Sequence, residues 1–443
     1  MNNKWLYLLW VSPLLAQLQT RPPVLKLSMK QAVQIALAPE GNTRVQLAQE
    51  ALKQAEAQAS ESRAALLPDV DSYVTDEALT RNLRALGLNF NLPPALGLSF
   101  PTVVGFDVFD ARATVNQNLF DFASIRRFQA SKVNVEATKS DSQGTQNQVT
   151  DQVARAYLTG IRAEAALETA QANVDLSEAL LKLARHQKEA GTGTGIEITR
   201  AQVQLANDKQ HFLVAKNDVD RAHLDLLKIL AIRLDSPIEL TDKLTYEPME
   251  PLEEAKAIET AHKTRAELRA QQQKETSAGL NYSAVKWERL PSLSGFADYG
   301  TIGTSVNNGI ATHTYGVTLR VPLFDGGRRD ARRTESASLL RQERIRTADL
   351  KDQVELDVRV ALDSLRSADD QVKVAEEGLQ LSDNELAQAR RRYEAGVTNS
   401  VELTDAQTRL DRARDNRITA LYNYNLARID LATAMGTIQS MIH

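Results

Sequence analysis

The sequence contains no cysteine, and this absence excludes several kinds of site. Without thiols the chain can form no disulfide framework, no thiolate metal site and no lipidated N-terminal cysteine. Its six histidines form no metal-ligand pair, and its serines show no nucleophile-elbow pattern. We therefore expect no enzyme activity, no cofactor and no bound metal.

A strong charge imbalance and long apolar runs are also missing. The 53 basic and 57 acidic residues leave a net charge of -4, so we expect no nucleic-acid partner. Beyond the N-terminus no run of about eighteen apolar residues occurs, which excludes membrane-spanning helices but not membrane-spanning strands. Residues 1–16, where Lys4 precedes an apolar run, predict a signal peptide; an ordinary apolar N-terminus is the alternative.

Proline is absent from the long stretch 328–394. Its apolar and small residues recur in alternating steps of four and three, which is the repeat of helices packed side by side in a coiled coil. A break at 395–399 separates it from a second helical pattern over 400–435. The sequence therefore predicts a helical hairpin whose first arm is about 100 Å long.

The same order of predicted helices and strands occurs twice in the chain. Motifs of the two copies correspond at an offset of 204 or 205 residues, for example Glu189-Ala-Gly191 with Glu394-Ala-Gly396. Such a repeat indicates two copies of one structural unit. We predict a first repeat over 17–232, an equatorial linker over 233–251 and a second repeat over 252–437. The elements predicted within the repeats are a helix at 28–66, strands within 69–120, a long helix at 123–190, a helix at 196–232, a helix at 252–289, strands within 292–324, a long helix at 328–394 and a helix at 400–435.

Helix lengths suggest how each unit is built. The two shorter helices of the first copy total about 114 Å, and the long one measures about 102 Å. Two half-length helices stacked end to end would therefore match one full-length helix. A generic antiparallel coiled-coil bundle, which needs no such match, is the alternative.

The clearest strand pattern runs from Thr314 to Leu323, with apolar residues on one face and mostly polar ones on the other. Strict alternation over about ten residues is typical of strands in a membrane barrel. The first copy has a longer loop between its strands, from about Arg81 to Gly105. A small soluble β-subdomain is the alternative. Four strands cannot close around a lumen, so a membrane-spanning sheet requires oligomerisation.

The two predicted hairpin turns contain glycine. Gly191-Thr-Gly-Thr-Gly195 lacks the preceding strand and the Gly-Lys-Thr/Ser ending of a phosphate-binding loop. Its partner in the repeat, Gly396-Val-Thr-Asn-Ser400, follows a long helix in the same way. Both stretches are therefore interpreted as helix–helix turns.

Several motifs, taken together, resemble the TolC-like outer-membrane efflux proteins. They are Leu27-Ser-Met-Lys-Gln-Ala-Val-Gln-Ile-Ala-Leu37, Val321-Pro-Leu-Phe-Asp-Gly-Gly327, Arg392-Tyr-Glu-Ala-Gly396 and Val401-Glu-Leu-Thr-Asp-Ala-Gln407. The likeness covers residues 27–437. It implies a mainly α fold with a small β part: duplicated long hairpins forming an α-barrel, and four strands per chain in a shared transmembrane β-barrel.

The resemblance also implies a function and a set of partners. A homotrimer would lie in the outer membrane, in contact with its lipid, and extend into the periplasm. It would conduct cargo passively, for efflux or type I secretion, with a periplasmic adaptor (membrane fusion protein) and an inner-membrane transporter. The alternative is a periplasmic coiled-coil adaptor or scaffold without a membrane barrel, but an adaptor carries one hairpin and this chain has two.

Candidate site residues lie around the hairpin ends. By the family's motif, Glu402 and Asp405 would ring the periplasmic entrance, where carboxylates favour cations. The alternative for Glu402 is a capping box with Asn399. Tyr393 matches a gate tyrosine of the family, whereas Thr398 stands where the family has an arginine. The tips expected to contact the adaptor are Gly191, Gly193, Gly195, Gly396 and Thr398.

Overall fold

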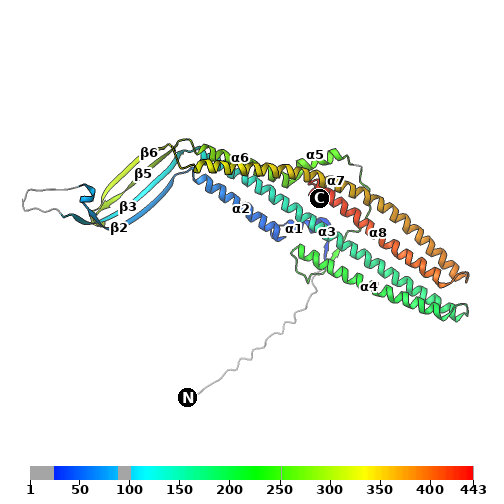
Figure 1. The fold of residues 1–443 in the computed structure, drawn as a ribbon. Coiled ribbons are helices and arrows are strands. Elements are labelled where there is room, and N and C mark those ends of the chain that lie inside the picture. The colour runs from blue at the N-terminus through cyan, green and yellow to red at the C-terminus, as the bar shows by residue number, and fades with distance from the viewer. Residues whose placement is uncertain (1–23, 88–100, 251, 443) are drawn as a thin grey trace, which may run out of the picture.

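The computed structural model describes residues 24–87, 101–250 and 252–442. The molecule is elongated, with a sheet at one end and the turns of two helical hairpins at the other (Figure 1). The signal peptide predicted at 1–16 and most of the loop between the first two strands lie outside the described residues. None of the described helices combines the length and the apolarity needed to cross a membrane.

Two long hairpins form the body of the molecule. Their helices are α3 (Phe122–Glu189) with α4 (Gly195–Ile229), and α7 (Arg328–Glu394) with α8 (Ser400–Ala434). The two helices of each hairpin pack together, and α3 also packs against α8. The resulting order, α4–α3–α8–α7, leaves α4 and α7 at opposite edges of the layer (Figure 1).

The prediction of one helix over 28–66 is wrong, because two helices form there. They are α1 (Met29–Leu37) and α2 (Thr43–Ala64). A Cβ at Gly41 would lie 2.4 Å from the carbonyl oxygen of Ile35, so only glycine allows the chain to fold back this closely. The α2 helix then continues beside α3 toward the sheet.

The helix predicted over 252–289 is also divided. It consists of α5 (Glu254–Thr264) and α6 (Ala266–Trp287), separated by Arg265, which has an extended backbone with ψ 117°. No proline or glycine marks this break. The Arg265 guanidinium donates to the Asp357 carboxylate of α7 and to the nearby Glu267, both at 2.7 Å, so a contact with a distant helix helps to stabilise the bend.

The segment 233–251 returns to the start of the chain. Its strand β4 (Ile238–Leu240) pairs in parallel with β1 (Leu25–Leu27). The buried Tyr157 of α3 donates its hydroxyl to the carbonyl oxygen of Leu27 at 2.8 Å. Burial raises the pKa of this phenol, which therefore stays protonated and keeps its donor. The contact holds the small sheet against the middle of α3.

The larger sheet is antiparallel, and its order is β2–β3–β5–β6. Its strands are β2 (Asp69–Asn82), β3 (Val103–Phe120), β5 (Ser292–Gly303) and β6 (Ile310–Arg320). Short helical segments are η1 (Arg84–Leu86), η3 (Val306–Asn308) and α9 (Ile438–Ile442). The last strand ends at Arg320 rather than at the predicted Leu323, because Pro322 has no N–H for the ladder.

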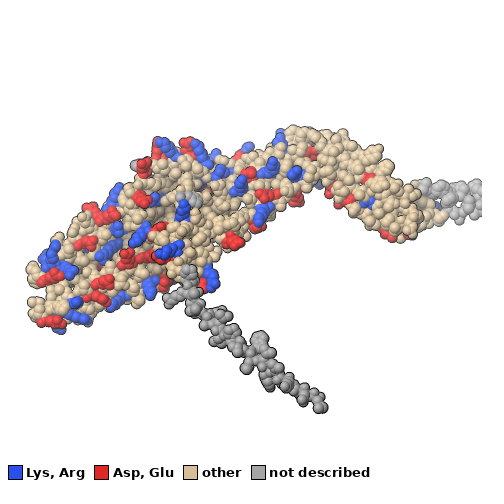
Figure 2. Space-filling model, turned by 180° about the vertical axis from the view of Figure 1, so that it is seen from behind, with Lys and Arg blue, Asp and Glu red and all other residues tan. Residues whose placement is uncertain are grey.

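The two faces of this sheet differ in polarity. Tyr315, Val317 and Leu319 share one face and are 78%, 63% and 63% exposed. On the opposite face the Arg112 guanidinium contacts the carboxylates of Asp110 at 2.8 Å and Asp298 at 2.9 Å. Charged side chains cover the helical part and become sparse over the sheet (Figure 2). The alternation predicted for the last strand is present in the fold.

Candidate functional site

The hairpin turns have the same backbone geometry. Gly191 and Gly396 follow α3 and α7 with φ values of +77° and +73°, a left-handed conformation that glycine adopts without strain. Each then donates its N–H to a carbonyl of the last helical turn, at 3.0 Å in both hairpins. At Gly193 the space is tight for a different reason, because a Cβ there would lie 3.0 Å from the backbone nitrogen of Lys188.

The first turns of α4 and α8 are capped differently. The Thr194 N–H donates to the Glu197 carboxylate at 2.8 Å, as in a capping box. In α8 the side chain of Asn399 instead accepts from the N–H of Val401 at 3.0 Å. The alternative reading of Glu402 as a capping-box partner of Asn399 is therefore wrong, and the Glu402 carboxylate is directed elsewhere.

Glu402 connects the turn to α7. Its carboxylate accepts from the Thr398 hydroxyl and lies 3.1 Å from the guanidinium of Arg392. Arg392 thus supplies a cation to this corner from the preceding helix. The pair is partly exposed, with 57% and 39% of the Arg392 and Glu402 side chains accessible.

Asp405 lies one turn further along α8. Its side chain is 61% exposed, and its carboxylate contacts Arg409 at 2.8 Å. Arg409 also reaches Glu385 of α7 at 2.9 Å. The two carboxylates expected at the entrance therefore each have an arginine partner, which partly neutralises their negative charge.

Tyr393 does not project into open space in this chain. It is 4% exposed and packs against Leu180 of α3 and Leu403 of α8. Its carbonyl oxygen accepts from the side-chain amide of Gln187 at 3.0 Å. Burial raises the pKa of the phenol, and the nearby Glu197 carboxylate raises it further. Tyr393 therefore joins the two hairpins close to their ends.

A groove of about 870 Å³ lies between α3, α4 and α8, below this contact. At its tip-facing end Asp208, which is 5% exposed, accepts from the hydroxyl of Ser177. The Gln407 amide donates to that hydroxyl at 2.6 Å, so three helices share one buried polar cluster. Asp411 lies next along α8, and one of its carboxylate oxygens is buried without a hydrogen-bond partner among the described residues.

Comparisons with known proteins decide the family. Residues 35–231 and 257–437 match the model of the outer membrane efflux protein family. The chain belongs to this family. Outer membrane protein TolC of Vibrio cholerae serotype O1 is 24% identical over 347 residues, covering 75% of this chain and 77% of TolC. The pyoverdine export outer membrane protein OpmQ of Pseudomonas putida is 23% identical over 395 residues, covering 87% and 81%.

The fold of this outer membrane efflux protein is also found in solved structures. The CmeC outer membrane channel of Campylobacter jejuni superposes with a TM-score of 0.78 at 16% identity, covering 92% of this chain and 85% of CmeC. The predicted family, the fold class and the outer-membrane localisation are thus confirmed. Its relatives are outer membrane channels for efflux or export.

Two acidic groups of the efflux protein were missed by the sequence reasoning. Burial raises the pKa of Asp411 to about 6, and the negative charge of Asp208 contributes in the same direction. The pKa of Asp415 is raised as well, mainly by burial, although His211 and Arg162 oppose the shift. The sequence does show polar residues at core positions of the coiled-coil repeat, as at Ser177. The repeat does not identify which residues such side chains contact.

Proposed function

We propose that three copies of this chain form a passive exit duct in the outer membrane, working with a periplasmic adaptor and an inner-membrane transporter. The support comes from the exposed edges of the chain. On each of two opposite sides, one edge strand of the sheet and one edge helix of the hairpin layer are open, and the elements on the two sides are different. One side presents β2 and α4, and the other presents β6 and α7 (Figure 1). Joining unlike edges head to tail generates a ring, in which no strand edge stays unpaired in lipid.

The helical edges carry apolar side chains suited to such a joint. On each helix, three of the exposed apolar residues are spaced at multiples of seven, the spacing of a coiled-coil seam. They are Ile196, Val203 and Leu224 on α4, and Val360, Val374 and Leu381 on α7. Three chains would supply twelve strands, enough for a closed barrel with a lumen, whereas four strands are too few.

Disulfide cross-linking tests the ring, and the absence of native cysteine removes background. Val214 of α4 and Val374 of α7 are 54% and 68% exposed, and each lies about 33 Å from its hairpin turn. We expect oxidised V214C/V374C to form linked dimers and trimers in outer-membrane fractions. The control V214C/R333C, whose second cysteine lies about 60 Å further along α7, should stay monomeric. A monomeric V214C/V374C chain in the membrane would exclude this arrangement.

We propose further that Glu402 and Asp405 form carboxylate rings at the periplasmic entrance, with Tyr393 holding the hairpins together beside them. Partial neutralisation by Arg392 and Arg409 predicts only moderate cation preference. In single-channel recordings E402Q and D405N should lower the cation-to-anion permeability ratio. R409Q is the informative control, because it uncovers Asp405 and should raise that ratio. Unchanged selectivity in all three variants would remove both carboxylates from the entrance.

The hairpin tips are proposed to contact the adaptor. The turn residues of this surface are Gly191, Gly193, Gly195, Gly396 and Thr398. Val397 lies among them and is 70% exposed, so it offers an apolar contact at the end of the second hairpin. A photo-crosslinking amino acid at position 397 should capture a periplasmic adaptor in cells. The same probe at Leu234, 58% exposed but in the equatorial region, should not. Equal capture at both positions would reject the tip as the contact.

A further inference from the structure

An aromatic patch continues the apolar face of the sheet onto the helices. After an irregularity in β3, Phe120 pairs with Leu293, whose neighbour across the sheet is the exposed Leu319. The Phe120 ring contacts Phe122 with centroids 4.3 Å apart, and Phe122 lies 5.3 Å from Trp287. Aromatic side chains in such a position mark the interface between lipid tails and headgroups.

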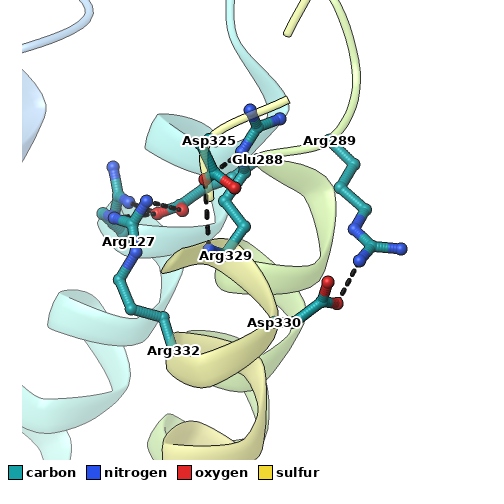
Figure 3. A network of polar contacts seen from close by, with 7 residues as sticks. All are labelled: Arg127, Glu288, Arg289, Asp325, Arg329, Asp330 and Arg332. Atoms are coloured by element: carbon teal, nitrogen blue, oxygen red, sulfur yellow. Dashed lines mark hydrogen bonds and ion pairs between the residues drawn. The ribbon is translucent and has the colours of Figure 1, made fainter. Parts of the chain in front are cut away.

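Just below the patch, three carboxylates are already neutralised by arginines (Figure 3). Arg127 of α3 and Arg332 of α7 both contact Glu288 at the end of α6. On the other side, Asp325 pairs with Arg329 at 2.7 Å and Asp330 pairs with Arg289. This network fixes the starts of α3 and α7 against the end of α6, where the helices meet the sheet.

The cations at this level that have no carboxylate within 4.0 Å among the described residues include Arg126, Lys286 and Arg328, which lie closest in sequence to the aromatic patch and the start of α7. Arg126 follows Phe122 by four residues on α3, so it occupies the same helix face about 6 Å further from the sheet. Lys286 directly precedes Trp287, and Arg328 is the first residue of α7. Against these three cations the patch itself carries one carboxylate, Asp121, which accepts from the Ala123 N–H and the Ser124 hydroxyl, so positive charge remains in excess.

We infer that Arg126, Lys286 and Arg328 form a basic collar that binds the anionic headgroups of phospholipids in the periplasm-facing leaflet of the outer membrane. This inference rests on the proposed function for the position of the membrane. Long basic side chains keep their methylene stems along apolar surface and direct the charge to the headgroup region. Each basic residue near an anionic surface strengthens binding about fivefold, so three per chain give a clear preference over zwitterionic lipid.

Trp287 provides a local probe for this contact. The chain has three tryptophans, and the other two are Trp5 and Trp10. In the full chain carrying W5F and W10F, all tryptophan fluorescence therefore arises beside the collar. Bromine on a lipid acyl chain quenches tryptophan at short range, so quenching reports which lipid lies next to Trp287.

The experiment compares vesicles in which either phosphatidylglycerol or phosphatidylcholine, at equal mole fraction, carries the bromine. We expect brominated phosphatidylglycerol to quench Trp287 at least threefold more effectively at low salt. The preference should fall to near unity in R126Q/K286Q/R328Q. It should persist in K182Q/K216Q/R391Q, which removes three exposed cations from the two hairpins, far from the sheet.

Other outcomes overturn the collar in distinguishable ways. Equal quenching by the two lipids in the parent chain would show that the collar does not select anionic headgroups, while the duct itself would stand. Loss of the preference in millimolar inorganic phosphate at constant ionic strength would identify a free-anion site instead. No quenching by either lipid would place Trp287 away from the membrane, and would overturn both the collar and the proposed duct.

Discussion

Replacing Asp411 with asparagine should stabilise the helical part of the protein at neutral pH. The Asp411 carboxyl lies in the groove between α3, α4 and α8, and its pKa rises from the ordinary 3.8 to about 6. Burial is the main cause, the charges of Asp208 and Asp415 add to it, and Arg414 and His211 oppose it. The folded chain must therefore hold an unfavourable negative charge there at pH 7.

The sign and size of the effect follow from this shift. Because the folded pKa lies above the unfolded one, the folded state holds the proton more tightly, and stability falls as pH rises from about 4 to about 6. Above that window the penalty is constant. At about 1.4 kcal/mol per pKa unit its upper bound is about 3 kcal/mol. Solvent screens this partly exposed group, so we expect D411N to add about 1–2 kcal/mol near pH 7.5 and nothing near pH 4.

Urea unfolding followed by far-ultraviolet circular dichroism, in detergent, measures the difference between variant and parent. The difference is the useful quantity, because carboxylates such as Asp369, whose pKa Lys373 lowers, give the opposite slope in both proteins. D383N removes an exposed carboxylate from α7 and should leave stability unchanged at either pH. A stabilisation by D411N that is equal near pH 4 and pH 7.5 would refute the electrostatic reasoning.

Three further substitutions test the contacts that hold the helices. Y393A removes a buried ring between the hairpins and should cost about 3–4 kcal/mol, seen as faster proteolysis of the hairpin ends, whereas Y393F should be nearly neutral. G396A places a side chain at φ +73° and should cost about 1–2 kcal/mol in urea unfolding, whereas G378A inside α7 should be neutral or stabilising. Y157F removes the donor to the Leu27 carbonyl and should cost about 1 kcal/mol in the same measurement.

The long hairpins could be predicted because their signal is repeated many times. The second hairpin is observed as Arg328–Glu394 followed by Ser400–Ala434, against the predicted 328–394 and 400–435. A coiled-coil repeat sustained over many turns outweighs the preference of any one residue, and glycine marks where each helix ends. The alternation of apolar and polar residues along the last strand could also be predicted, because one face of the sheet is apolar.

Features that depend on distant partners could not be read in the same way. The bend at Arg265 has no proline or glycine as a marker, and one of the contacts that stabilises it is with Asp357 on another helix. The alternative role of Glu402 as a helix cap failed for a related reason, since Arg392 and Thr398 compete for its carboxylate. Spacing identifies which residue types can meet, but only the packed helices decide which of them do.

The packing between the two hairpins differs between their middle and their tips. This difference indicates where an entrance would open at the lowest cost in free energy. Large apolar clusters hold the chain together around its middle, including Tyr157 of α3 and Tyr424 of α8. Near the turns, α3 and α8 are joined by the small cluster around Tyr393 and by the polar contact between Ser177 and Gln407, and Arg414 of α8 donates to Asn173 of α3 next along the helices. Separating the tips therefore exposes little apolar surface, and the buried polar groups would regain water as they part. Local opening free energy follows such differences in packing, so we expect the contacts between α3 and α8 near the tips to open more readily than those in the middle.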